Sequence, residues 1–148
     1  MRNILTTILL TCCLASATLA ANEKLVLVTG KNSNIEKISN KQLKRAYIGL
    51  TLKQNNNLIK PIRNHSDNFA HEVFLQNVIV MSSRIYERQL TTRALRKGSK
   101  RPVSKSTQKK LVSHLNNTEN SISYMWEREA LKSKSVKIIQ SLWSASKK

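Results

Sequence analysis

The segment at residues 38–50, ISNKQLKRAYIGL, carries the clearest structural signal in the sequence. Ser39 is followed three residues later by Gln42, a pattern typical of a capping box at the start of a helix. Apolar side chains then recur at helical spacing. They are Leu43, Ala46 and Tyr47. Because Gly49 follows directly, the sequence predicts a short amphipathic helix that ends at this glycine.

Short apolar runs before and after this helix predict β-strands. Residues 24–30, KLVLVTG, form a β-branched run that stops at a glycine, which is typical of a buried strand. A second strand is predicted over residues 58–63, where Pro61 lacks an N–H group and favours an edge or an irregularity. Residues 121–126 (SISYMW) and 136–140 (VKIIQ) predict two late strands.

Three further helices are predicted between these strands, over residues 68–81, 82–95 and 104–117. The last of them is expected to begin at Ser104 as its cap. In the helix over 82–95, several apolar side chains are expected to share one inward side. They are Ile85, Tyr86, Leu90, Ala94 and Leu95. The order of strands and helices predicts an α/β fold.

The N-terminus predicts the compartment. Residues 1–22 read MRNILTTILLTCCLASATLAAN, with Arg2 before an apolar run and small residues after it. This pattern predicts a secretory signal peptide over residues 1–20, leaving a single domain over 21–148 in a bacterial periplasm or outside the cell. An uncleaved anchor and lipidation at Cys12 are the alternatives. Both cysteines, Cys12 and Cys13, lie in the signal, so no disulfide is expected in the mature chain.

The charge predicts an anionic partner. The 148 residues include 26 Lys and Arg against 8 Asp and Glu, a formal net charge of +18. Hydrophobic residues make up 40% of the chain, enough for a packed core. Nucleic acid is not the expected partner, because the aromatic residues fall mostly at predicted core positions and not among the basic residues. The signal peptide also removes the protein from the cytoplasm.

Motifs of enzyme sites are missing from the sequence. It holds no HExxH, GxSxG, GxGxxG or P-loop pattern, and only 3 glycines and 3 histidines in all. No two acidic residues are spaced as a general acid and base. We therefore expect neither an enzyme nor a cofactor nor a metal site.

Three polar loops are candidate anion sites, because backbone amides and hydroxyl groups before a helix bind phosphate-like groups. They span residues 29–33, 63–68 and 97–101. The third is the middle part of the basic stretch 93–110, whose two ends are predicted to be helical. In the second loop, Asp67 is expected either to accept a proton from a protonated anion or to cap the following helix.

Several segments together resemble one protein family. Residues 38–50 resemble a segment S-x-x-(Q/E)-L-x-x-(I/A)-(F/Y)-x-G near the start of the phosphate-binding proteins of ABC-type phosphate importers. Residues 59–82, with IKPIRNHSDNF at their start, resemble a later segment of that family, and LRKGSKRPV at 95–103 resembles its glycine-containing loop. SISYMW lies where the family has a G-A-I-G-Y-V strand.

The resemblance covers most of residues 24–140 and implies an α/β fold of the type II periplasmic-binding-protein-like class. The chain would be a reduced domain of about half the family's size, with a mixed sheet flanked by helices. The implied function is binding of phosphate or a similar small oxyanion for an ABC-type importer, with the importer permease as a partner. The implied ligand contacts are Arg63, Ser66, Asn68, Lys97, Gly98 and Arg101.

The sequence departs from the family at two places. It has Ser66-Asp67-Asn68 where the family often has Ser-Gly-Thr, and Ser121 and Ser123 where the family has glycines. These departures support a second hypothesis of another class. In it, the domain has lost its ligand pocket and is an interaction or adaptor module that docks on an acidic surface of the cell envelope.

Overall fold

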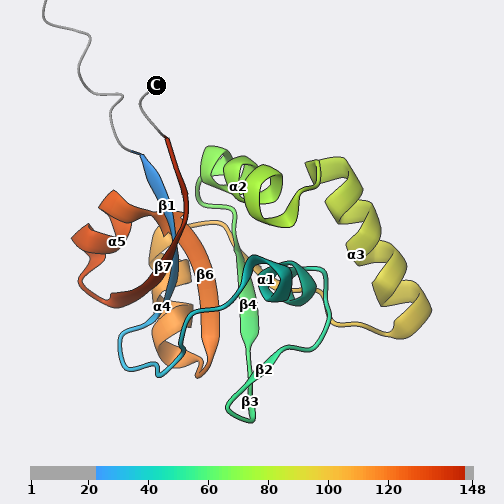
Figure 1. Cartoon of the computed structure of the whole chain (residues 1–148), viewed down its shortest axis with the longest axis horizontal. Helices are drawn as coiled ribbons and strands as arrows, with labels where there is room; N and C mark the ends of the chain where they lie inside the picture. Colours follow the sequence, from blue (N-terminus) through green and yellow to red (C-terminus); the bar gives the residue numbers. More distant parts are fainter. Residues whose placement is uncertain (1–22, 146–148) are drawn as a thin grey trace, which may run out of the picture.

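A computed structural model of the chain describes residues 23–145 (Figure 1). The predicted signal peptide lies outside the described residues. The elements, in chain order, are β1 (Lys24–Gly30), α1 (Asn40–Tyr47), β2 (Lys53–Gln54), β3 (Asn57–Leu58), β4 (Lys60–Asn64), α2 (Asn68–Phe74), the π-helix η1 (Leu75–Ile79), α3 (Ser83–Lys97), β5 (Val103–Lys105), α4 (Gln108–Asn117), β6 (Ser121–Trp126), α5 (Glu127–Ser133) and β7 (Val136–Ser144).

The core of the fold is a five-stranded mixed sheet in the order β5-β4-β6-β1-β7. Strand β4 pairs in parallel with both β5 and β6, whereas β1 pairs antiparallel with β6 and β7. The short strands β2 and β3 form a separate hairpin. Strands β4, β5 and β6 therefore end at the same edge of the sheet.

Helices cover both faces of the sheet because successive side chains of β1 point to opposite sides. Leu25 and Leu27 pack in a cluster with residues of α1, α2, η1 and α3. Val26 and Val28 pack in a second cluster with residues of α4 and with Ala130 of α5. The result is a three-layer α/β/α arrangement, in which α3 and α5 lie at opposite sides of the molecule (Figure 1). The helices within residues 23–145 are too short or too polar to span a bilayer.

The helix predicted over residues 38–50 is present as α1. The Ser39 hydroxyl accepts from the Gln42 amide at 3.3 Å, and the Gln42 side chain accepts from the Ser39 amide at 3.1 Å, so the capping box is complete. The three apolar residues predicted to share a face are buried: Leu43, Ala46 and Tyr47. Gly49 follows the helix with a φ of 85°, a left-handed conformation that favours glycine.

Strands β1 and β6 have the predicted bounds, but the predicted start of the helix over 104–117 was wrong. Ser104 does not cap a helix. It lies in β5, where Arg63 and Ser104 are register partners, and the helix begins four residues later with Thr107 as its cap. The predicted helix over 68–81 changes to a π-helix after Phe74. Short strand β5 and helix α5 were not predicted.

The inward side of α3 is narrower than its apolar residues predict. Tyr86 and Leu90 are buried, but Ile85 is 48% exposed and Leu95 is 82% exposed. Only one side of the helix lies against the rest of the protein, so apolar residues elsewhere on its circumference remain in solvent.

Pro61 lies in β4, which has a neighbour on both sides. Strand β5 pairs with β4 only from Ile62 onward, and the preceding Lys60 amide donates to Asn120 on the β6 side at 2.8 Å. Because adjacent residues alternate in direction, the proline nitrogen faces the side where β5 has not yet begun. Strand β4 is therefore interior, but it has no partner on the β5 side at Pro61. The missing N–H group of the proline consequently removes no hydrogen bond between β4 and β5.

Candidate functional site

The carboxyl edge of the parallel strands gathers the loop that follows β4. The His65 amide donates to the Lys105 carbonyl at the end of β5 at 2.9 Å. The Trp126 indole at the end of β6 donates to the Asp67 carboxylate at 2.9 Å. The loop is therefore fixed to both neighbouring strands. In open α/β sheets, ligands bind at this edge.

Two of the predicted cations meet beside this edge on one carboxylate. Arg63 of β4 donates to the Glu87 carboxylate of α3 at 2.6 Å and to the Pro102 carbonyl at 3.2 Å. Arg101 donates to the other oxygen of the same carboxylate. Arg63 is largely buried, with 11% of its side chain exposed, whereas Arg101 and Glu87 are partly exposed. The cluster carries two positive charges and one negative charge.

A pair of histidines lies next to this cluster. The rings of His65 and His71 have centroids 4.4 Å apart, and His71 Nδ1 lies 2.6 Å from the Tyr124 hydroxyl. Within residues 23–145, the buried Nε2 atom of His65 has no hydrogen-bond partner. Burial and the nearby positive charge of Arg63 lower the pKa of His65, so the ring is neutral at neutral pH. His65 therefore offers a neutral polar group beside Arg63.

The other residues of this loop make local contacts. The Ser66 amide and hydroxyl both donate to the Asn64 side-chain oxygen, at 2.9 and 2.6 Å. Asp67 caps α2, because its carboxylate accepts from the Ala70 amide at 3.0 Å. Of the two roles predicted for Asp67, the structure therefore contains the helix cap. Asn68 is exposed in the first turn of α2.

The last two predicted residues lie at the end of α3. Lys97 is the final residue of the helix, and Gly98 follows with a left-handed φ of 61°. Lys97 lines a cavity on the side of α3 together with other basic side chains. The six predicted contacts therefore lie in three places. Arg63 and Arg101 meet at Glu87, whereas Ser66 and Asn68 lie at the start of α2. Lys97 and Gly98 lie at the far end of α3.

Sequence reasoning missed Glu87, which connects the two arginines. It lies 24 residues from Arg63 along the chain, in the middle of a helix. No local spacing relates the two residues, so no sequence signal identifies the contact. A group of three or more His, Cys, Asp or Glu side chains that could hold a metal ion is absent from the part of the chain that the structure describes.

Ser121 and Ser123 stand where the phosphate-binding proteins that the sequence resembles have glycines, and both hydroxyl groups have hydrogen-bond partners inside the protein. The Ser121 hydroxyl donates to the Leu115 and Thr118 carbonyls, at 3.2 and 2.7 Å. The Ser123 hydroxyl donates to the Ile62 carbonyl at 2.9 Å. Both hydroxyls are directed to the backbone, which explains how polar side chains are accommodated in the fully buried β6.

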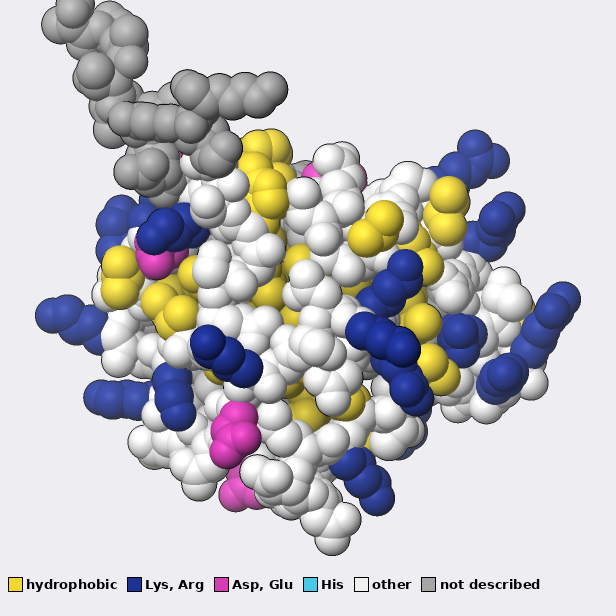
Figure 2. Space-filling view, in the orientation of Figure 1, with side chains coloured by type: hydrophobic (Ala, Val, Ile, Leu, Met, Phe, Trp, Pro, Cys, Tyr) yellow, Lys and Arg dark blue, Asp and Glu magenta, His cyan; other side chains and the backbone are white. Residues whose placement is uncertain are grey.

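Basic side chains dominate the surface around these elements. Figure 2 shows Lys and Arg side chains spread over the face, including several on the α3 side, whereas Asp and Glu side chains are few. Within residues 23–145, four ion pairs are formed, and two of these involve Glu87. Most of the positive charge is thus not neutralised by carboxylates.

Comparison with solved structures identifies the class of fold. The chain is similar to an ABC-type phosphate transport receptor from Vibrio cholerae, with a TM-score of 0.58 and 17% identity over 81% of this chain and 47% of that one. It is also similar to PstS from Borrelia burgdorferi (TM-score 0.56, 13% identity, 81% of this chain and 47% of that one). A protein described as a possible phosphate binding protein from Planctomyces limnophilus gives a TM-score of 0.54 at 12% identity, over 81% and 42%.

These likenesses confirm the predicted fold class. The chain has a periplasmic-binding-protein-like α/β fold, with a mixed sheet flanked by helices. It spans less than half the length of these three proteins. No family model matches the sequence, and no curated protein matches it.

Proposed function

We propose that the protein is a solute-binding-like protein of the periplasm that binds phosphate or a similar small oxyanion at the carboxyl edge of β4. The observation that carries this proposal is the meeting of Arg63 and Arg101 at one point beside His65. The likeness to phosphate receptors supports the ligand class. An ABC-type permease is the proposed partner, and residues 1–20 are the proposed signal peptide.

An oxyanion would use the arginine N–H groups that Glu87 does not occupy. A guanidinium has five N–H donors in a planar fork, and the contacts of Arg63 with Glu87 and Pro102 engage one nitrogen each. A dianion would bring two negative charges to a cluster with a net charge of +1. Binding therefore requires Glu87 to move away or to share the arginines, and Glu87 is expected to weaken anion binding.

Titration calorimetry of the purified protein with phosphate, and separately with sulfate, tests this proposal. We expect binding in the millimolar range or tighter, reduced about tenfold or more by Arg63→Gln. Lys132→Gln, which removes an exposed charge on α5, is the matched control and should leave the affinity within about twofold. Absence of heat at millimolar phosphate and sulfate would refute the ligand assignment.

The second candidate function is an interaction module without a solute pocket, and one observation favours it. The donors expected to hold an anion already have partners within the protein: Glu87 holds both arginines, and Asn64 accepts both donors of Ser66. If these partners exclude an anion, the positive charge of the domain would instead attract it to acidic surfaces of the cell envelope. Salt-sensitive binding to anionic vesicles that Arg63→Gln leaves unchanged, without phosphate binding, would support this module over solute capture.

A further inference from the structure

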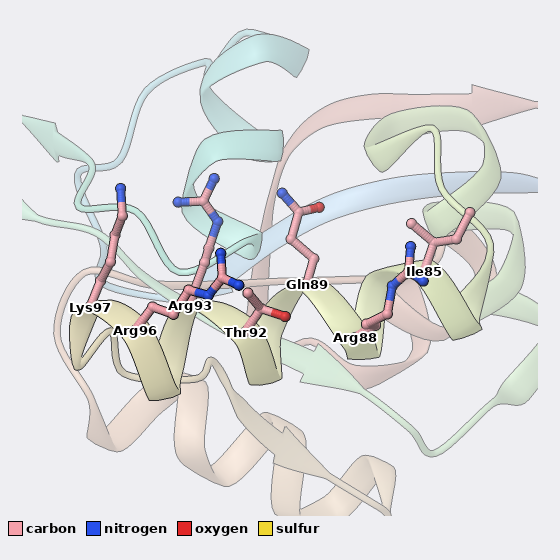
Figure 3. A pocket seen from close by; sticks show the side chains of 7 residues that line it. All are labelled: Ile85, Arg88, Gln89, Thr92, Arg93, Arg96 and Lys97. Carbon is pink, nitrogen blue, oxygen red and sulfur yellow. The ribbon is translucent and has the colours of Figure 1, made fainter.

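A second basic feature lies on α3, on the side away from Glu87. A cavity of about 380 Å³ is lined there by seven side chains of α3, of which four are cationic, two polar and one apolar. They are Arg88, Arg93, Arg96, Lys97, Gln89, Thr92 and Ile85. Figure 3 shows these side chains leaving the helix from its successive turns around one hollow. We call this cavity the α3 groove.

The α3 groove has no carboxylate in its lining. Glu87 is the only acidic residue of α3, and it pairs with Arg63 and Arg101. Because an α-helix turns by about 100° per residue, Arg96 lies roughly 180° around the helix from Glu87. The four cations therefore line the cavity without a counter-ion from their own helix.

The spacing of the cations makes this arrangement unfavourable in the absence of an anion. Arg93 and Lys97 are four residues apart and Arg93 and Arg96 three apart, so both pairs are neighbours on the helix surface. Like charges at these spacings destabilise a helix. The dipole of α3 favours cations in its last turn, which accounts for Arg96 and Lys97 but not for Arg88, near the middle of the helix.

Arg93 supplies an independent sign of a missing partner. Its Nε atom is buried and, within residues 23–145, has no hydrogen-bond partner. Leaving a buried charged donor unsatisfied is costly. Arg63, by contrast, directs its Nε atom to the Pro102 carbonyl. An anion in the α3 groove that contacts the guanidinium group of Arg93 would offset part of this cost and reduce the repulsion between the cations.

The shape of the α3 groove indicates the kind of anion. Arg88 and Lys97 are separated by nine residues, or about 14 Å along the helix axis. A single phosphate group cannot contact cations spread over that length, whereas several linked phosphate groups can. Ile85 is the one apolar side chain among the lining residues, and the strongly exposed Leu95 is not one of them.

We propose that the α3 groove binds a short chain of linked phosphate groups, at a site separate from the Arg63 cluster. Arg88, Arg93 and Arg96 provide planar guanidinium forks for phosphate groups, and Lys97 adds a point charge. Gln89 and Thr92 provide neutral hydrogen-bond donors between them. This proposal does not depend on oxyanion binding at Arg63.

Calorimetry with tripolyphosphate at near-physiological salt tests the site, because salt suppresses weak contacts of exposed charges. The variant Arg93→Gln/Arg96→Gln should bind tripolyphosphate at least tenfold more weakly than the unmodified protein. The control Lys132→Gln/Lys134→Asn removes the same charge from the far side of the molecule, and asparagine suits the left-handed φ of 50° at Lys134. This control should stay within about twofold.

Two further measurements complete the test. Orthophosphate should bind the α3 groove more weakly than tripolyphosphate, and tripolyphosphate should raise the melting temperature of the protein but not of Arg93→Gln/Arg96→Gln. Equal loss of tripolyphosphate binding in that variant and in the α5 control would overturn the proposal in favour of unspecific charge attraction. Variant-sensitive binding to phosphatidylglycerol vesicles without tripolyphosphate binding would overturn it in favour of a membrane surface.

Discussion

Arg63 of β4 and Glu87 of α3 form a charged hydrogen bond of 2.6 Å, and the same carboxylate also accepts from Arg101. This contact joins α3 to the sheet edge that carries the candidate oxyanion site. Glu87 consequently has two effects. It neutralises part of the charge that an anion would need, and it stabilises the position of a helix that buries only Tyr86 and Leu90.

Replacement Glu87→Gln is expected to separate these effects. Loss of the carboxylate leaves the largely buried Arg63 without its counter-ion, so the free energy of unfolding should fall by about 1–3 kcal/mol. Phosphate should bind more tightly, because Arg63 and Arg101 no longer share a carboxylate. Urea unfolding and calorimetry with phosphate measure the two quantities.

Glu36→Gln is the matched control for this replacement. Glu36 is exposed and forms none of the ion pairs within residues 23–145, so stability should change by no more than about 0.5 kcal/mol. Weaker phosphate binding in Glu87→Gln would mean that Glu87 supports the anion site and does not compete with the anion for the arginines.

The parts of the fold that the sequence predicts are those specified by nearby residues. The cap of α1 is formed by Ser39 and Gln42, which are three residues apart. The buried strand β6 likewise coincides with one segment of six consecutive residues, SISYMW. Strand β5 could not be predicted in this way. Its three residues are extended because they pair with β4, and a serine before a polar run has the same local pattern as a helix cap.

The candidate site depends still more on distant contacts. Arg63 and Arg101 could be proposed as anion contacts, since arginines in polar loops have that chemistry. Their shared carboxylate could not, because the docking of α3 on the sheet determines which residue of the helix faces them. The α3 groove was not predicted either. The sequence shows the cations of α3 but not which of them line one cavity.

The free energy of unfolding should fall on acidification because of His71. Burial is the largest cause that lowers the pKa of this side chain from 6.5 to about 4, and its exposed fraction is 8%. Below pH 6.5 the unfolded chain binds a proton that the folded protein does not, so stability decreases as pH falls from about 6.5 to about 4. The loss should be on the order of 3 kcal/mol.

Urea unfolding at a series of pH values measures this effect. His71→Gln should lose most of the pH dependence between about pH 6.5 and 4, whereas His114→Gln, on the more accessible surface of α4, should retain most of it. An unchanged slope in His71→Gln would assign the pH dependence to other groups.

Gly30 is predicted to be intolerant of any side chain. A Cβ atom at this position would lie 2.4 Å from the Leu115 carbonyl oxygen of α4, and backbone atoms cannot move aside as a flexible side chain would. Gly30→Ala should therefore destabilise the protein by about 1–3 kcal/mol, measured by urea or thermal unfolding.

Gly98→Ala adds the same methyl group where no atom lies within 4 Å. The cost there should be limited to the left-handed φ of 61°, about 1–2 kcal/mol, and Gly98→Asn should reduce it. Equal stability of Gly30→Ala and the unmodified protein would show that α4 can withdraw from β1.

The helix caps give a test of where the helices begin. Ser39→Ala removes the hydroxyl that accepts from the Gln42 amide, so it should lower the free energy of unfolding by about 1 kcal/mol. Thr107→Ala should cost a similar amount, because the Thr107 hydroxyl accepts from the Lys110 amide at 3.3 Å. Ser104→Ala is the control, since Ser104 is exposed in β5 and caps no helix, and its effect should be within about 0.5 kcal/mol. A cost for Ser104→Ala equal to that for Thr107→Ala would place the start of α4 at Ser104, where the sequence alone predicts it.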